Sequence, residues 1–81
     1  MVKYYLSEDI TGKEVIEELE AKRIGTIKDI AFTMEGKVAF IVETESKKGE
    51  PIEVFLPFEK IIKVGDVVII KSTKDLERAT E

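Results

Sequence analysis

The sequence has no cysteine and no histidine among its 81 residues. Without cysteine the chain forms no disulfide bond and offers no thiolate to a metal. Without histidine it lacks a frequent metal ligand and the side chain that most often transfers protons near neutral pH. These two absences exclude a disulfide-stapled scaffold, the usual zinc sites and a Ser-His-Asp catalytic triad.

Long apolar runs and clustered glycines are missing as well. No apolar run approaches the roughly 18 residues that a membrane-spanning helix needs, and acidic residues occupy the N-terminal stretch where a signal peptide has its apolar core. The five glycines are scattered singly, so there is no glycine-rich phosphate-binding loop. We therefore expect a cytoplasmic protein with no membrane span, which the lack of cysteine also fits.

An excess of basic residues is the third absence. The chain carries 13 Lys and Arg against 17 Asp and Glu, which gives a net charge of −4. A nucleic-acid-binding protein normally has surplus positive charge, because its Lys and Arg side chains displace counterions from phosphates. The charge balance therefore argues against nucleic acid as a partner.

The acidic cluster of Glu17, Glu18 and Glu20 is the nearest approach to a set of metal ligands. Carboxylates bind Ca²⁺ or Mg²⁺ when their spacing matches a ligand loop, and this spacing matches none. A solvated acidic face is the favoured interpretation. We expect no metal, no cofactor and no catalytic residue.

The sequence does contain compact apolar clusters, four to eight residues long, within a highly charged chain. Clusters of this length, rich in β-branched and aromatic residues, are typical of short strands. A chain of 81 residues makes one domain with a small core. Small folds often gain stability from disulfides, metals or a second subunit, and here self-association is the supplement still open.

The clearest local signal is a hairpin made of residues 23–33 and 37–44, joined by a turn that ends in Gly36. Residues 52–56 form the next strand. Pro57 ends it, because proline lacks the backbone donor of a strand ladder.

The C-terminal third contains a helical turn, a tight turn and a final strand. Residues 58–62 suit one helical turn. Gly65 and Asp66 then turn the chain into residues 67–70, a run too apolar to face water on both sides.

The last ten residues are charged and contain few apolar side chains. We therefore place the folded domain at residues 1–71. A charged tail, frayed or forming a short exposed helix, follows at residues 72–81.

Three segments, taken together in their order along the chain, match a known sequence pattern. They are residues 11–16 (TGKEVI), 23–30 (RIGTIKDI) and 56–70 (LPFEKIIKVGDVVII). In this order and spacing they resemble the PRC-barrel family, whose usual form is a Gly-Lys-x-Val opening, an Ile-Gly-x-Val-x-Asp strand and a final Pro-x-x-x-Ile followed by Gly-Asp. The resemblance implies an all-β fold, a small PRC-type barrel of five or six strands with one short helical turn before the last strand.

The resemblance also bears on an ambiguous segment. Residues 13–23 consist largely of good helix formers, so propensity alone predicts a helix there. The family pattern instead favours a strand at residues 13–16, then a turn and a second strand. The family usually has a glycine in that turn. Residues 17–22 contain none, so the turn must be built differently.

A long strand that serves both sides of a small barrel must bend, and Gly25 lies where such a bend fits. Ile27 breaks the parity of its apolar neighbours, which predicts a bulge near Lys28 and Asp29. We expect the following residues to shape turns and bends of the backbone: Gly12, Gly25, Gly36, Gly65 and Asp66.

The resemblance implies binding and not catalysis. Family members occur in the cytoplasmic part of a photosynthetic reaction-centre subunit, in a ribosome-maturation factor, and as free-standing small proteins of archaea, some tied to cell division. This chain looks most like the free-standing archaeal kind. We expect a non-enzymatic adaptor that binds another protein, with archaeal cell division as one setting, and that forms a homodimer.

Two alternatives remain open. The first is an RNA- or ribosome-associated processing factor, which the acidic composition disfavours. The second is a small-molecule binder, which is disfavoured because a barrel of five or six strands is filled by its own side chains.

Strand periodicity predicts the core residues Val15, Ile24, Ile30, Val38, Phe40, Val42, Val54, Leu56, Ile61 and Val67. The opposite strand faces predict an outer apolar patch, a kind of surface that usually marks a binding site. Its candidate interface residues are Ile41, Phe55, Val68 and Ile70. The competing interpretation is that the C-terminal segment, with Leu76, or the turn at residues 58–62 covers this patch within one chain.

Overall fold

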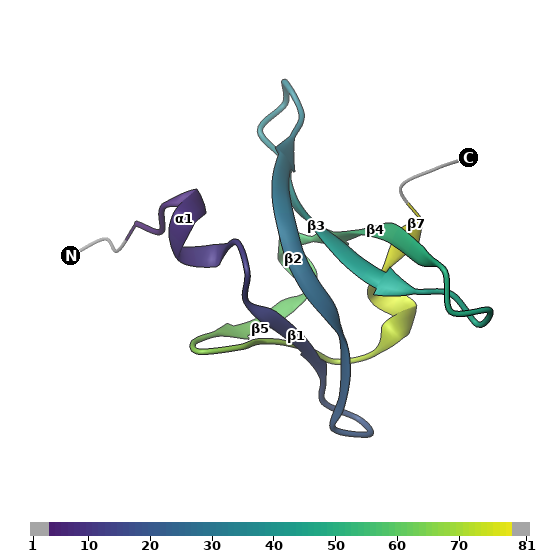
Figure 1. The fold of residues 1–81 in the computed structure, drawn as a ribbon. Coiled ribbons are helices and arrows are strands. Elements are labelled where there is room, and N and C mark those ends of the chain that lie inside the picture. Colours follow the sequence, from purple (N-terminus) through teal and green to yellow (C-terminus); the bar gives the residue numbers. More distant parts are fainter. Residues whose placement is uncertain (1–3, 79–81) are drawn as a thin grey trace.

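The computed structural model describes residues 4–78, which form one mixed β-sheet with three short helical turns (Figure 1). The strands are β1 (Glu14–Glu17), β2 (Lys22–Phe32), β3 (Val38–Glu45), β4 (Pro51–Pro57), β5 (Ile61–Val64), β6 (Val68–Ile70) and β7 (Glu77–Arg78). The helical turns are α1 (Ser7–Ile10), η1 (Phe58–Lys60) and η2 (Thr73–Asp75). The strand order is β5-β6-β1-β2-β3-β4-β7, and within it the β1–β6 pair is parallel.

The predicted all-β class is confirmed. Six strands of three or more residues make up the described sheet, and the two-residue β7 extends it. The helical turn predicted at residues 58–62 is η1, and it is shorter than predicted. It ends at Lys60, because Ile61 already enters β5, a strand that the sequence did not reveal.

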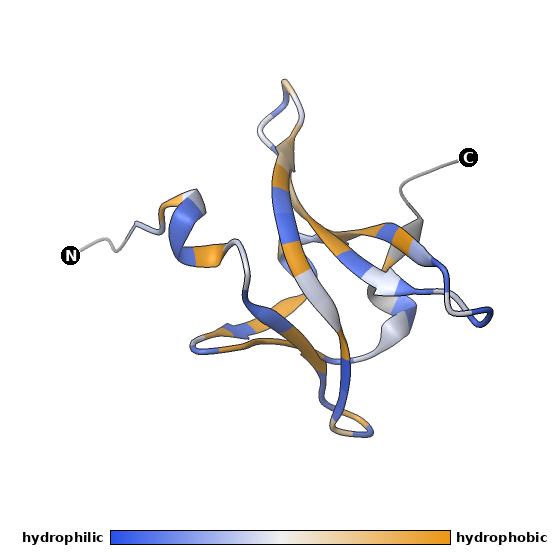
Figure 2. Ribbon diagram, in the orientation of Figure 1, coloured by the Kyte–Doolittle hydropathy of each residue, from blue (hydrophilic) through white to orange (hydrophobic). Residues whose placement is uncertain are grey.

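β2 is the longest strand, and it joins the two halves of the sheet. It pairs with β1 through residues 22–26 and with β3 through residues 26–32. Its ladder with β3 shifts register between Ile27 and Asp29, which confirms the predicted bulge near Lys28. Apolar and polar segments alternate along β2, whereas β3 is apolar from Val38 to Val42 and polar after it (Figure 2).

Gly25 lies where β2 passes close to β3. A Cβ atom built on Gly25 would stand 2.1 Å from the backbone oxygen of Glu43, much nearer than real contacts. A larger residue would push the two strands apart at this point. It would also disturb Thr44, whose hydroxyl donates a hydrogen bond to the carbonyl oxygen of Ile24.

The other predicted turn residues lie at chain reversals. Gly36 ends the β2–β3 turn with a φ of +95°, which glycine adopts without strain. Gly12 follows α1 in the turn that leads to β1. Gly65 and Asp66 reverse the chain between β5 and β6, where the N–H of Gly65 donates to the carbonyl oxygen of Val67 at 2.9 Å.

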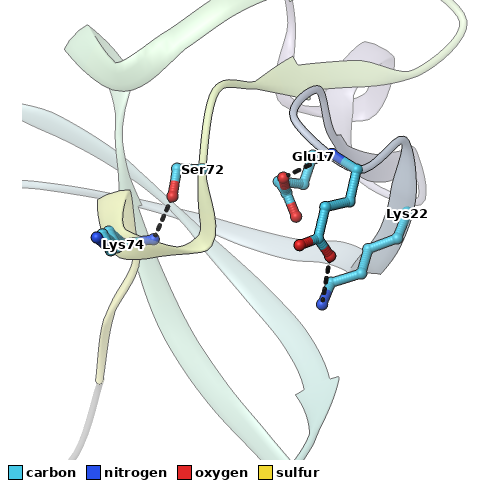
Figure 3. A network of polar contacts seen from close by, with 5 residues as sticks. Glu17, Lys22, Ser72 and Lys74 are labelled. Carbon is cyan, nitrogen blue, oxygen red and sulfur yellow. Dashed lines mark hydrogen bonds and ion pairs between the residues drawn. The ribbon is translucent and has the colours of Figure 1, made fainter.

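The predicted strand at residues 13–16 corresponds to β1, so the helix favoured by propensity does not form. Two features replace the family glycine in the turn that follows. Ala21 adopts a left-handed φ of +55°. The side chain of Glu17 is buried, with the residue 4% exposed, and its Oε2 accepts a hydrogen bond from the N–H of Glu20 at 3.0 Å (Figure 3).

The core lies on the inner face of the coiled sheet. Among the described residues its apolar members are Ile10, Val15, Ile27, Phe40, Val42, Val54, Leu56, Val68 and Ile70. Five predicted core residues are therefore buried, namely Val15, Phe40, Val42, Val54 and Leu56. Three others are half-buried and pack against the core: Ile24, Ile30 and Ile61.

Two core predictions differ from the structure. Val38 is exposed, because β2 and β3 extend beyond the elements that cover their inner face. Val67 is half-buried and precedes β6, while Val68 and Ile70 are 0% exposed. The predicted face of this strand is therefore wrong. β6 pairs in parallel with β1, and buried Val15 lies in register with Val68, so the partner side chains also point inward.

The segment after residue 71 belongs to the same sheet as far as it is described. Leu76 is half-buried and packs against the core, and β7 pairs with β4, with Glu77 in register with Phe55. The predicted boundary at residue 71 thus falls before a segment that folds back onto β4. Residues 79–81 of the predicted tail lie outside the described residues.

Truncating Phe40 tests the core. We expect Phe40→Ala to lower the free energy of unfolding by about 3–5 kcal/mol, because it leaves a cavity among fully buried neighbours. Phe32→Ala is the matched control on the same face of the same hairpin, where the side chain is 75% exposed. Its expected cost is about 1 kcal/mol or less. Equal losses in urea unfolding would contradict the described burial.

Ala21→Gly tests the first turn. Glycine relieves the left-handed conformation but gains more freedom in the unfolded chain, so we expect a net stabilisation of about 0.5–1 kcal/mol. Ala39→Gly, within β3 and paired to both β2 and β4, is the control, and it should destabilise by a similar amount. The midpoint of urea unfolding measures both variants. A lower midpoint for Ala21→Gly would show that the turn stores no strain.

Candidate functional site

A site for metal or acid–base chemistry does not emerge from the described residues. Among the described side chains, those of residues 4–74 and 76, no group of three or more acidic residues is arranged to hold a metal ion. The predicted acidic cluster is divided, because Glu17 points inward to close its turn while Glu18 and Glu20 are exposed. Glu20 pairs instead with Lys22 at 3.5 Å (Figure 3).

The turns shown in Figure 3 are structural. Ser72 caps η2, since its hydroxyl accepts a hydrogen bond from the N–H of Lys74 at 3.1 Å. Beside it, the turn after β1 donates from the N–H of Glu18 to the carbonyl oxygen of Ile70 at 2.8 Å. These hydrogen bonds close turns of the chain, and they do not make up a catalytic arrangement.

Within the part of the chain described, no helix is long and apolar enough to cross a membrane.

The distinctive surface is apolar and lies at the end of the β2–β3 hairpin. This hairpin projects from the body of the molecule (Figure 1). Phe32 and Val38 face each other across it, and Met34 in its turn is 96% exposed. We call the following six residues, all exposed, the apolar end: Tyr4, Tyr5, Phe32, Met34, Val38 and Phe58.

A groove borders the hairpin on its inner side. Its volume is about 310 Å³. Phe40 lies at its base and contacts Phe58 edge-on, with ring centroids 6.3 Å apart and an interplanar angle of 75°. No charged side chain lines this aromatic groove, whose described lining is Tyr4, Tyr5, Ile10, Ile30, Val38, Phe40, Phe58 and Val64.

The outer face of the hairpin carries a second apolar surface, with a hollow of about 420 Å³. Ala31, Ala39 and Pro57 lie side by side on β2, β3 and β4, and Ile41 pairs with Phe55 in the adjacent position. Both Ile41 and Phe55 are half-buried. β7 pairs with β4 beside Phe55, so the chain itself flanks part of this face.

The four predicted interface residues therefore do not form one surface. Ile41 and Phe55 are neighbours on the outer face, whereas Val68 and Ile70 are fully buried in the core. The prediction is wrong for Val68 and Ile70. All four residues from 67 to 70 are apolar, so alternation gave no indication of which pair faces inward.

An ion pair lies beside the outer face. The Nζ of Lys28 is 3.1 Å from Oε2 of Glu53. The hydrogen bond from Lys28 to Glu53, followed by the negative charge of Glu53, raises the pKa of Lys28 above its ordinary value. Both side chains are exposed to solvent, so the pair adds polarity at the margin and little stability.

The sequence analysis missed the apolar end for a physical reason. Phe32 and Val38 continue the inward parity of Ile30 and Phe40, which predicts burial. Parity fixes the face of a strand and says nothing about how far neighbouring elements extend over that face. The signal in the sequence was that Phe32, Met34 and Val38 lie among polar turn residues, at the end of the hairpin.

The described residues form a small β-sheet protein with an exposed apolar surface. The family model for the PRC-barrel domain matches residues 2–77. The match covers nearly the whole chain, and the chain belongs to the PRC-barrel family. None of the curated proteins matches it.

Removal of metal provides a test of the site description. The chain has no histidine or cysteine, and its described acidic residues are not clustered. We therefore expect dialysis against EDTA to leave the circular dichroism spectrum and the melting temperature unchanged. A melting temperature that falls on dialysis and recovers on adding Ca²⁺, Mg²⁺ or Zn²⁺ would contradict this expectation.

Proposed function

We propose that this PRC-barrel protein is a non-enzymatic adaptor that binds another protein through the apolar end. One observation carries the proposal: large apolar side chains, led by Phe32 and Met34, are exposed together at the tip of a projecting hairpin. Contiguous exposed apolar surface on a small protein usually marks a binding site. Aromatic residues and Met are also the residue types enriched in protein interfaces.

The same surface is less suited to RNA. An RNA-binding sheet interleaves aromatic with basic residues, so that stacking and phosphate contacts occur together. The aromatic groove is lined without a charged side chain, and the chain has a net charge of −4. An RNA- or ribosome-associated role is thus the weaker candidate. A 260/280 nm absorbance ratio typical of protein alone in the purified sample would agree with this.

The cellular setting that we propose is the cytoplasm of an archaeal cell, with cell division as the process served. The support is membership of the PRC-barrel family, whose free-standing members include small archaeal proteins, some of them tied to cell division. The proposal for the cellular setting does not depend on the proposal for the binding surface, which is supported by the exposure of the apolar end.

Affinity capture from native cell extract tests the proposed function. The wild type is compared with the Phe32→Ser, Met34→Ser double variant, and bound proteins are quantified by mass spectrometry. We expect at least one captured protein to fall about tenfold or more with the variant, because such anchors dominate interface energies. The purified partner should then show the same loss in calorimetry.

Leu19→Ser is the matched control. Leu19 is 68% exposed in the turn between β1 and β2, at the far end of β2 from the apolar end. Its substitution removes a comparable apolar side chain and should leave capture unchanged. If capture is equal for all three proteins, the apolar end is not the binding surface.

A further inference from the structure

The apolar end has a convex part and a concave part that adjoin. Phe32 and Met34 project from the hairpin tip, while the aromatic groove is hollowed between the hairpin, η1 and the N-terminal segment. Val38 belongs to both, since it pairs with Phe32 across the hairpin and also lines the groove. A single chain cannot fold the tip of its own β2–β3 hairpin back into this groove, because the paired strands are extended.

We propose that a second copy of this chain fills the groove, so that the hairpin tip of each protomer lies in the aromatic groove of the other. This inference rests on the proposed function of the apolar end as a protein-binding surface, and in it a second copy of the chain takes the place of another protein at Phe32 and Met34. Phe32 and Met34 are the inserted side chains. Phe58 is the groove residue that they contact.

Symmetry makes this arrangement a closed dimer. When a projection and a groove lie on different faces, copies associate head to tail and form open chains. When they adjoin on one face, a two-fold axis between them satisfies both contacts at once and leaves nothing unpaired. The shared residue Val38 marks where that axis passes.

The available area suits a dimer of ordinary size. A large side chain presents about 150–250 Å², so the six partly exposed residues of the apolar end offer roughly 700 Å² per chain. A stable interface of standard size takes about 800 Å² from each partner. Side chains at the margin of the contact readily supply the difference.

Charge around the apolar end also permits self-association. The chain has a net charge of −4, which makes two copies repel each other overall. The residues that border the apolar end carry both signs, with Glu35 near Lys37 in the hairpin turn and Glu59 and Lys63 beside the groove. Two copies that meet here therefore bring opposite charges within reach of each other.

Sedimentation equilibrium at micromolar concentration measures the association. We expect the wild type to be a dimer and its melting temperature to rise with protein concentration. Met34→Glu, at a 96% exposed position that leaves the core intact, should weaken the dimer by about 100-fold or more, since each dimer contains the change twice. Leu19→Glu is the control and should remain dimeric.

Cross-linking tests the reciprocal geometry. The chain has no cysteine, so introduced thiols react without background. Chains with Met34→Cys are mixed with chains with Phe58→Cys and treated with a short bismaleimide. We expect the mixed 34–58 product to exceed the 34–34 and 58–58 products several-fold, whereas Leu19→Cys chains should give no such product with either.

The outcomes separate this inference from the proposed function. A wild type that is monomeric at micromolar concentration overturns the dimer, as does a dimer that Met34→Glu leaves intact. A predominance of 34–34 product overturns the reciprocal geometry. In each case the proposed protein-binding function is still supported if the Phe32→Ser, Met34→Ser variant captures less of a partner protein. It is contradicted together with the dimer if capture is unchanged.

Discussion

The structure depends on how β2 is shared between two partner strands. Its first half pairs with β1 and its second half with β3, so the strand must coil sharply within eleven residues. Gly25 permits the close approach to Glu43, and the ladder with β3 shifts register after Ile27. Ile27 is fully buried at this point, so the bend also places this side chain in the core.

That shared strand explains why the surface is uneven. The inner face of β2 and β3 is covered near Phe40, but the hairpin continues past the last covering element, so Phe32 and Val38 reach solvent. The edge strand β5 does not offer a comparable binding surface, because its backbone is protected. It is four residues long, shifts register between Ile61 and Lys63, and carries an exposed lysine, features that discourage strand addition. The hairpin tip therefore offers exposed apolar side chains, whereas the β5 edge offers little free backbone for strand addition.

Much of the fold could be predicted because its signals are local. The central hairpin follows from β-branched runs around a turn that ends in Gly36, and the bulge follows from the broken parity at Ile27. The first turn was less predictable. Ala21 is an unusual residue for a left-handed conformation, and the buried carboxylate of Glu17 looked in sequence like one more surface charge. The candidate site was predicted least well, since two of its four residues are in the core.

The sequence by itself determined the all-β class, the strand positions in the central hairpin and the absence of histidine and cysteine chemistry. Tertiary structure alone decided which face of β6 points inward. Val68 and Ile70 are buried because β6 pairs in parallel with β1, some fifty residues away in the chain. It also decided the exposure of Phe32 and Met34. Alternation assigns a side chain to a face, but its burial depends on whether a distant segment reaches far enough to cover it.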